Sequence, residues 1–187
     1  MKRNQTHAEA SLPLLWLVSD ARNDAALERA LQELPQGSGF IYRHYHLAEG
    51  ARRTRFDALS NLARTRGHLV ILSSDASLAR EWGATGIYGS PDRLANAPGL
   101  IRLATVHNAA EIAAANRIGA DAALLSPVFP TRSHPGSEVL GTARFRELAQ
   151  LAEMPVIALG GMTPDTAREL DWPRWAAIDG LGSPKES

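Results

Sequence analysis

The segment GADAALLSP at residues 119–127 decides the fold. It begins with a glycine suited to the left-handed end of a helix, continues through a short aliphatic run, and leaves that run at Ser-Pro. Similar segments stand at residues 83–91, GATGIYGSP, and at residues 176–184, AAIDGLGSP. One unit, a helix end followed by a strand and a turn, recurs along the chain, although Gly-Ala and Ser-Pro are also common dipeptides.

Aliphatic runs and amphipathic stretches alternate on both sides of that segment, which is the pattern of βαβ units around a parallel sheet. Strands are predicted at residues 14–19, 40–46, 69–73, 86–89, 100–106, 122–128, 155–159 and 175–181. Apolar residues at helical spacing predict helices at residues 24–34, 55–65, 76–82, 109–118, 142–151 and 164–170. Asn108 and Glu111 have the spacing of a capping box at the start of the helix 109–118.

Eight strands with no G-x-G-x-x-G motif after the first favour a (β/α)8 TIM barrel of the α/β class. The rival is a doubly wound open sheet, which has the same alternation. The chain has 187 residues, against roughly 250 for this fold, and only GSPKES follows the eighth strand. We therefore expect a compact barrel that lacks its last helix, with residues 1–12 as a disordered tail and residues 13–187 as a single domain.

The composition predicts a soluble protein without a charged macromolecular partner. The 20 basic residues balance the 20 acidic residues, so no net field favours nucleic acid or an anionic membrane. No cysteine is present, which excludes disulfides, thiolate metal sites and a cysteine nucleophile. The N-terminus is polar where a signal peptide needs an apolar run, and the longest apolar stretch, residues 12–18, is far shorter than the roughly 20 residues of a membrane span. We expect a cytoplasmic location.

In a barrel of this type the active site lies at the carboxyl ends of the strands. The segment there that is richest in polar groups is SPVFPTRSHPG at residues 126–136, where three prolines stiffen a long loop. Thr131, Arg132, Ser133 and His134 supply hydrogen-bond donors from this loop, which suits the binding of an anion.

The turn LGGMTPD at residues 159–165 is a second candidate. Gly160 and Gly161 follow the seventh predicted strand, and Thr163 is suited to cap the helix that begins near Pro164. Amide N–H groups left open by glycine before a helix can bind phosphate. A tight left-handed turn with no ligand fits this dipeptide equally well.

Two further side chains stand at strand ends. His107 follows the fifth predicted strand, where a neutral imidazole can exchange protons near pH 7. Arg43 is suited to act as a fixed cation for a phosphate. A structural or surface role is the alternative for each. H-E-x-x-H, G-x-S-x-G and P-loop motifs are absent, so zinc peptidase, hydrolase-elbow and nucleotidase functions lack support.

These segments, in this order, resemble the thiamine phosphate synthase and TenI (thiazole tautomerase) superfamily, whose members are small barrels. The likeness covers nearly the whole chain and is strongest in TVHN at residues 105–108, GADAALLSPVFPT at 119–131 and PVIALGGMTPD at 155–165. LWLVSD at 15–20 resembles the first strand of the family, and Arg43 falls where the second strand carries an arginine that binds diphosphate.

The resemblance implies a small phosphorylated substrate, a thiazole phosphate, held by the Gly160–Gly161 turn and the end of the eighth strand, with the loop 126–134 closing over it. It implies binding roles for Arg43, Thr105, Thr131 and Ser133 as well. His107 stands where TenI-type members carry the catalytic histidine, and His134 replaces the lysine of the loop as a second catalytic candidate.

Several departures from the synthase pattern concern Mg²⁺. The Asn-Asp pair that ends the third strand in the synthases is Ser73-Ser74 here, which argues against magnesium binding. Asp92 matches the second metal-binding aspartate only if one residue is deleted before it. The glutamine and lysine that flank the arginine of the second strand are Ile41 and Tyr45.

We therefore predict a divergent member of this superfamily that acts on a thiazole phosphate, either as a synthase or as a tautomerase. A tautomerase needs only a phosphate anchor and a proton shuttle, whereas a synthase must also stabilise departing pyrophosphate. The alternative is a catalytically inactive barrel that binds a phosphorylated ligand. No nucleic acid or membrane partner is expected, and a homodimer that covers the flank left by the missing helix is plausible.

Overall fold

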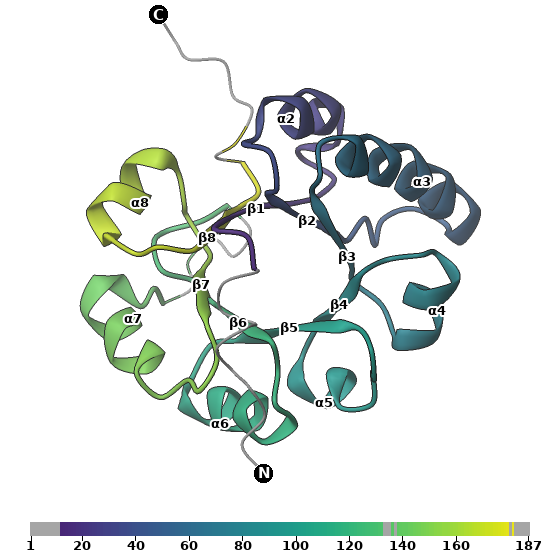
Figure 1. Ribbon diagram of the computed structural model, residues 1–187. Coiled ribbons are helices and arrows are strands. Elements are labelled where there is room, and N and C mark those ends of the chain that lie inside the picture. The colour runs from purple at the N-terminus through teal and green to yellow at the C-terminus, as the bar shows by residue number, and fades with distance from the viewer. Residues whose placement is uncertain (1–11, 133–135, 137, 180, 182–187) are drawn as a thin grey trace, which may run out of the picture.

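The computed structural model describes residues 12–132, 136, 138–179 and 181, and it is a closed barrel of eight parallel strands (Figure 1). β1 pairs with β2 on one side and with β8 on the other, which closes the sheet. This closure confirms the TIM barrel over the open sheet. The strands are β1 (Leu15–Val18), β2 (Gly39–Tyr42), β3 (Leu69–Leu72), β4 (Gly86–Gly89), β5 (Ile101–Val106), β6 (Ala122–Leu125), β7 (Val156–Ala158) and β8 (Trp175–Ala177).

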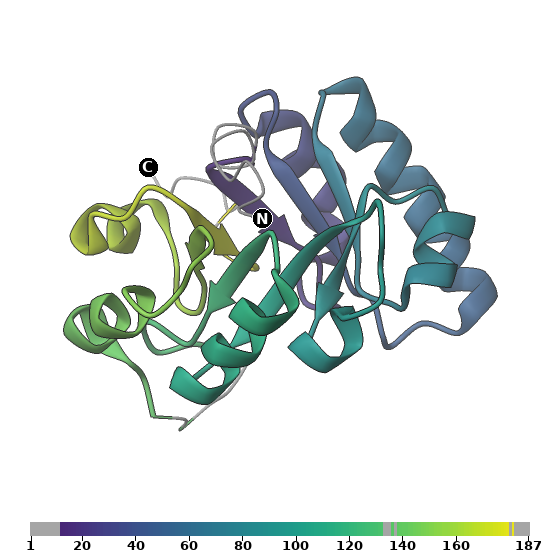
Figure 2. The same ribbon diagram turned by 60° about the horizontal axis from the view of Figure 1, so that its bottom comes forward.

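Helices surround the barrel and cover the outer face of the strands (Figures 1 and 2). They are the 3-10 turn η1 (Asp24–Ala26), α2 (Leu27–Glu33), α3 (Glu49–Thr65), α4 (Ala76–Glu81), α5 (Pro91–Leu94), α6 (Ala109–Ile118), α7 (Gly141–Ala149) and α8 (Pro164–Leu170). α5 was not predicted because a single turn is too short to show helical spacing. None of the helices formed by the described residues has the length and hydropathy to cross a bilayer.

Two apolar layers hold the barrel together. Side chains that alternate along the strands point inward, so Trp16 and Val18 lie in the inner layer while Leu17 packs outward against the helices. Gly39 makes room for Trp16, because a Cβ at Gly39 would lie 2.0 Å from the Trp16 ring. Leu12 is also buried in the inner layer, so the folded domain includes this residue, which the sequence analysis had left in the tail.

Parts of the sequence prediction lie outside the described residues. These parts are the tail at residues 1–11 and the end of the chain at residues 182–187, so the expected lack of a last helix stays a prediction. The cytoplasmic location and the homodimer also stay predictions.

Candidate active site

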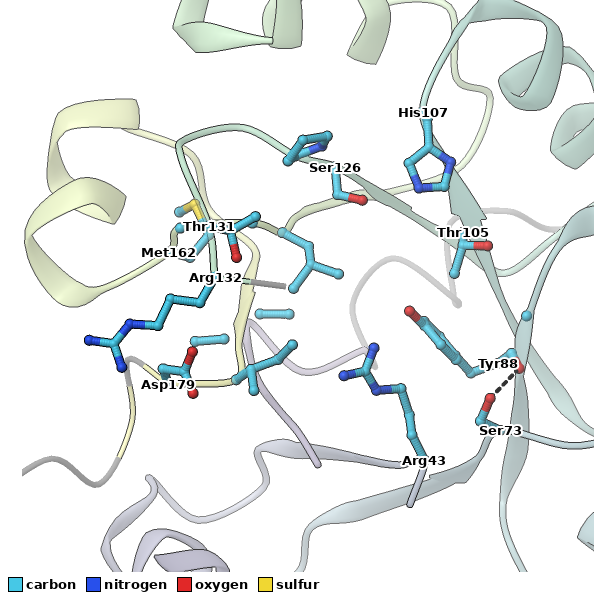
Figure 3. A pocket seen from close by; sticks show the side chains of 18 of the residues that line it. Arg43, Ser73, Tyr88, Thr105, His107, Ser126, Thr131, Arg132, Met162 and Asp179 are labelled. Carbon is cyan, nitrogen blue, oxygen red and sulfur yellow. Dashed lines mark hydrogen bonds between the residues drawn. The ribbon is translucent and has the colours of Figure 1, made fainter. Parts of the chain in front are cut away.

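A cavity of about 1010 Å³ opens at the carboxyl ends of the strands. It is lined by residues that directly follow seven of the strands, β2 to β8, as the barrel rule predicts (Figure 3). Tyr88 forms part of its inner wall, and burial raises the pKa of this phenol. The cavity lining combines aromatic, aliphatic and hydroxyl side chains with three arginines, Arg43, Arg93 and Arg132.

Arg43 lines the cavity and donates three hydrogen bonds to Ser19 and Asp20. Its amide N–H donates to Ser19 Oγ at 2.8 Å, its Nε donates to the Ser19 carbonyl at 3.0 Å, and its Nη2 donates to Asp20 Oδ2 at 2.8 Å. Figure 3 shows its guanidinium directed toward the Tyr88 phenol inside the cavity. Arg93, from α5, also lines the cavity, so two arginines that are always charged belong to its lining after β2 and β4.

His107 and Thr105 line the cavity side by side, at the mouth of the barrel as predicted (Figure 3). The imidazole Nδ1 lies 2.8 Å from Glu111 Oε2. Hydrogen bonds from the His107 ring and amide lower the pKa of Glu111, against burial, which raises it, so the carboxylate is ionised at neutral pH. Nδ1 therefore carries a proton and donates to Glu111, which leaves Nε2 as the nitrogen that can exchange a proton with a ligand.

Glu111 is a functional candidate that the sequence analysis placed only in a capping box. The Asn108 side chain does cap α6 by accepting from the Glu111 amide at 3.0 Å. The Glu111 carboxylate, however, does not complete the capping box by accepting from the backbone N–H of Asn108. It accepts from the backbone N–H and the ring of His107 and from the side-chain Nδ2 of Asn108. The spacing of His107 and Glu111, four residues apart across the start of α6, was the signal for this pair.

Gly160 and Gly161 also line the cavity, and both have positive φ, +96° and +64°. The loop after β6 packs directly on them, because Val128 donates to the Leu159 carbonyl at 3.0 Å and Phe129 donates to the Gly160 carbonyl at 3.1 Å. Within the described part of the chain, the amide N–H groups of Gly160 and Gly161 have no protein acceptor. The turn therefore has a packing role, and its two amides lie in the cavity lining with no acceptor among the described residues.

Replacing Gly161 with alanine is expected to lower the free energy of unfolding by about 1–3 kcal/mol, because a Cβ there lies 2.5 Å from the Pro130 carbonyl in a left-handed backbone. Urea denaturation followed by circular dichroism measures the change. Gly99→Ala is the matched control, since its φ is +78° and its Cβ meets open space. Equal losses in the two variants would contradict a packing role for Gly161.

The remaining predicted site residues fall in three groups. Thr131 and Arg132 line the cavity near Gly161, whereas Ser133 and His134 lie outside the described residues. The Thr163 side chain caps α8 as predicted, accepting from the Thr166 amide. The sequence analysis missed Arg93, because an arginine in a one-turn helix gives no distinctive pattern.

The carboxylates around the cavity do not form a magnesium site made of protein ligands alone. Asp75 uses its Oδ1 to cap α4, accepting from the Leu78 amide at 2.9 Å, and Asp179 lies 3.3 Å from Arg22. Asp92 lies in the exposed first turn of α5, outside the cavity lining, where a hydrogen bond from Ser90 lowers its pKa. Among the described residues, no three His, Asp or Glu side chains could hold a metal ion together, so Asp92 gains no support as a ligand.

Sequence comparisons with known proteins agree on one family. The model of the thiamine monophosphate synthase family matches residues 15–171. The thiamine-phosphate synthase of Chlorobium luteolum is 30% identical over 167 residues, which are 84% of this chain and 78% of that protein. The thiamine-phosphate synthase of Pyrococcus furiosus is 26% identical over 165 residues, 83% of this chain and 79% of that protein.

A solved structure supports the same fold. The thiamine phosphate pyrophosphorylase from Pyrococcus furiosus superposes with a TM-score of 0.78 and 23% sequence identity, covering 94% of this chain and 90% of that chain.

Proposed function

Because this chain belongs to the thiamine monophosphate synthase family, we propose that it is a transferase that joins an aminopyrimidine diphosphate to a thiazole phosphate and releases pyrophosphate. The family resemblance in the sequence is thus confirmed, and an inactive ligand-binding barrel is not favoured. The choice between transferase and tautomerase depends on how many phosphorylated groups the cavity is suited to bind.

The observation that supports the transferase proposal is that residues suited to bind anions line the cavity on two sides. Arg43 and Arg93 follow β2 and β4, whereas Gly160, Gly161 and Arg132 belong to the loops after β7 and β6. These loops lie on different sides of the barrel mouth (Figure 1). A tautomerase that acts on one monophosphate needs one anchor, but a transferase that joins two phosphorylated molecules needs two.

In this proposal, the thiazole phosphate binds the free amides of Gly160 and Gly161, and the diphosphate faces Arg43 and Arg93. The bond between the aminopyrimidine carbon and the diphosphate oxygen breaks while that carbon bonds to the thiazole. The two arginines meet the charge that develops on the departing pyrophosphate. His107 acts in its doubly protonated form, in which Nδ1–H donates to the Glu111 carboxylate and Nε2–H donates its proton to the pyrophosphate, leaving the neutral ring. No step is assigned to Mg²⁺, since no three His, Asp or Glu side chains of the described residues gather as ligands for it.

The test is to incubate the protein with both substrates, with and without Mg²⁺, and to measure thiamine phosphate and pyrophosphate by chromatography. We expect both products in equal amounts, and Asp92→Ala should leave their rate of formation unchanged. The second candidate is a tautomerase. The His107–Glu111 pair favours this reaction, because a tautomerase needs a proton shuttle and no metal ion. Isomerisation of a thiazole phosphate on its own, without condensation, would replace the transferase proposal by this one.

A further inference from the structure

His44 is a buried titratable residue that the proposed reaction does not use. It follows Arg43 directly, and its side chain is 0% exposed although it lies beside the cavity-lining arginine. Its backbone is left-handed, with a φ of +42°, and its ring stacks on Tyr42 with centroids 4.7 Å apart. A non-glycine residue rarely adopts this backbone, so surrounding contacts must hold it there.

Both ring nitrogens of His44 have partners. Nε2 lies 2.7 Å from Asp24 Oδ1, and Nδ1 lies 2.8 Å from Ser19 Oγ. Asp24 also accepts from Arg55 Nε at 2.8 Å. Burial raises the pKa of Asp24, but the hydrogen bonds from His44 and Arg55 outweigh it and lower that pKa. The Asp24 carboxylate is therefore ionised at neutral pH and accepts a proton-bearing nitrogen.

These partners define the tautomer of His44. Burial lowers the pKa of His44, so the ring is neutral at neutral pH and carries one proton. That proton lies on Nε2 and points to Asp24. Nδ1 is then a bare acceptor and receives the hydroxyl proton of Ser19.

Ser19 connects His44 to Arg43 through hydrogen bonds. With its hydroxyl proton directed at His44, the Ser19 oxygen keeps lone pairs free and accepts the Arg43 amide N–H at 2.8 Å. The Ser19 carbonyl accepts Arg43 Nε at 3.0 Å. One hydrogen-bond chain therefore runs from the Asp24 carboxylate through His44 and Ser19 to the backbone of the arginine.

We propose that His44 is a positioning residue, which holds Arg43 in the cavity lining by accepting the Ser19 hydroxyl proton. The proposal rests on the assignment of Arg43 as an anion-binding residue in the proposed function. The same three residue types make up hydrolytic triads, but Ser19 is 0% exposed and cannot reach a substrate. Its hydroxyl therefore orients the arginine rather than attacking a ligand.

The experiment measures binding of inorganic pyrophosphate by calorimetry in matched variants of the full chain. His44→Asn and His44→Gly both tolerate the left-handed backbone, but only asparagine places an acceptor near the position of Nδ1. We expect His44→Gly to raise the Kd about tenfold and His44→Asn to stay within about threefold of the unmodified protein. Ser19→Ala removes the hydroxyl that bonds both His44 Nδ1 and the Arg43 amide, so it should also raise the Kd about tenfold.

His68→Gln is the control for a buried histidine without a route to the cavity, since its Nε2 donates to the Leu31 carbonyl at the opposite end of the barrel. This variant should bind pyrophosphate normally. Equal affinities of the asparagine and glycine variants would overturn the role of the acceptor. If Arg43→Ala weakens binding but His44→Gly and Ser19→Ala do not, the inference about His44 is wrong while the anion site stands. If Arg43→Ala binds pyrophosphate as tightly as the unmodified protein, the anion site of the proposed function is itself wrong.

Discussion

Replacing Arg43 with alanine is expected to lower kcat/KM for thiamine phosphate formation by about 10²–10³-fold, the loss typical of removing one preorganised group that meets developing charge. Arg43 is 18% exposed in its side chain and fixed by Ser19 and Asp20, so it needs no rearrangement when the pyrophosphate departs. Steady-state release of pyrophosphate, measured with a coupled assay, gives kcat and KM separately. Since the arginine acts on charge that develops during the reaction, most of the loss should be in kcat.

Arg43→Lys tests whether charge alone suffices. Lysine keeps the charge but cannot bond the Ser19 carbonyl and Asp20 in the same fork, so we expect only a small part of the activity to return. Arg29→Ala serves as the control, because Arg29 forms an exposed pair with Glu33 on α2 and should leave the rate unchanged. Full activity in Arg43→Lys would show that the planar geometry held by Ser19 does not matter for the reaction.

Most of the barrel could be predicted because buried strands and helix faces have their own periodicity. β4 was predicted with the bounds the structure has, and β5 within one residue. β2 was predicted to run to residue 46, but it ends at Tyr42. The run of aromatic and histidine residues has the composition of a strand, yet the backbone becomes left-handed at His44, where the ring bonds Ser19 and Asp24.

The site was predicted in position but not in its contacts. The rule that places active sites at the carboxyl ends of barrel strands was enough to select Arg43 and His107. Their partners could not be predicted in the same way, because Ser19 lies 24 residues before Arg43 and becomes its neighbour only when β1 pairs with β2. Gly161 had a packing partner, Pro130, that comes from a loop after another strand. Such non-local contacts have no signal in local spacing.

Replacing His107 with glutamine is expected to lower kcat for thiamine phosphate formation by about a hundredfold, the lower end of what a general acid contributes, because a pyrophosphate oxygen is a weak base. His107 Nε2 is the nitrogen free for this role, since Nδ1 donates to Glu111 Oε2. The KM values should change little, because the residues proposed to bind the two anions do not include His107. Rapid-quench measurement of the first turnover separates this chemical step from product release.

Glu111→Gln tests whether the carboxylate orients and charges the imidazole. The amide can still accept the Nδ1 proton through its oxygen but no longer stabilises the protonated ring, so we expect a loss of about tenfold, smaller than for His107→Gln. Glu147→Gln is the matched control on α7, where the carboxylate pairs with Arg144 at the surface. A His107→Gln variant with an unchanged first-turnover rate would exclude proton transfer by this residue. Loss of thiazole isomerisation without loss of condensation would assign His107 to tautomerase chemistry, because only that reaction must move a proton between ring positions.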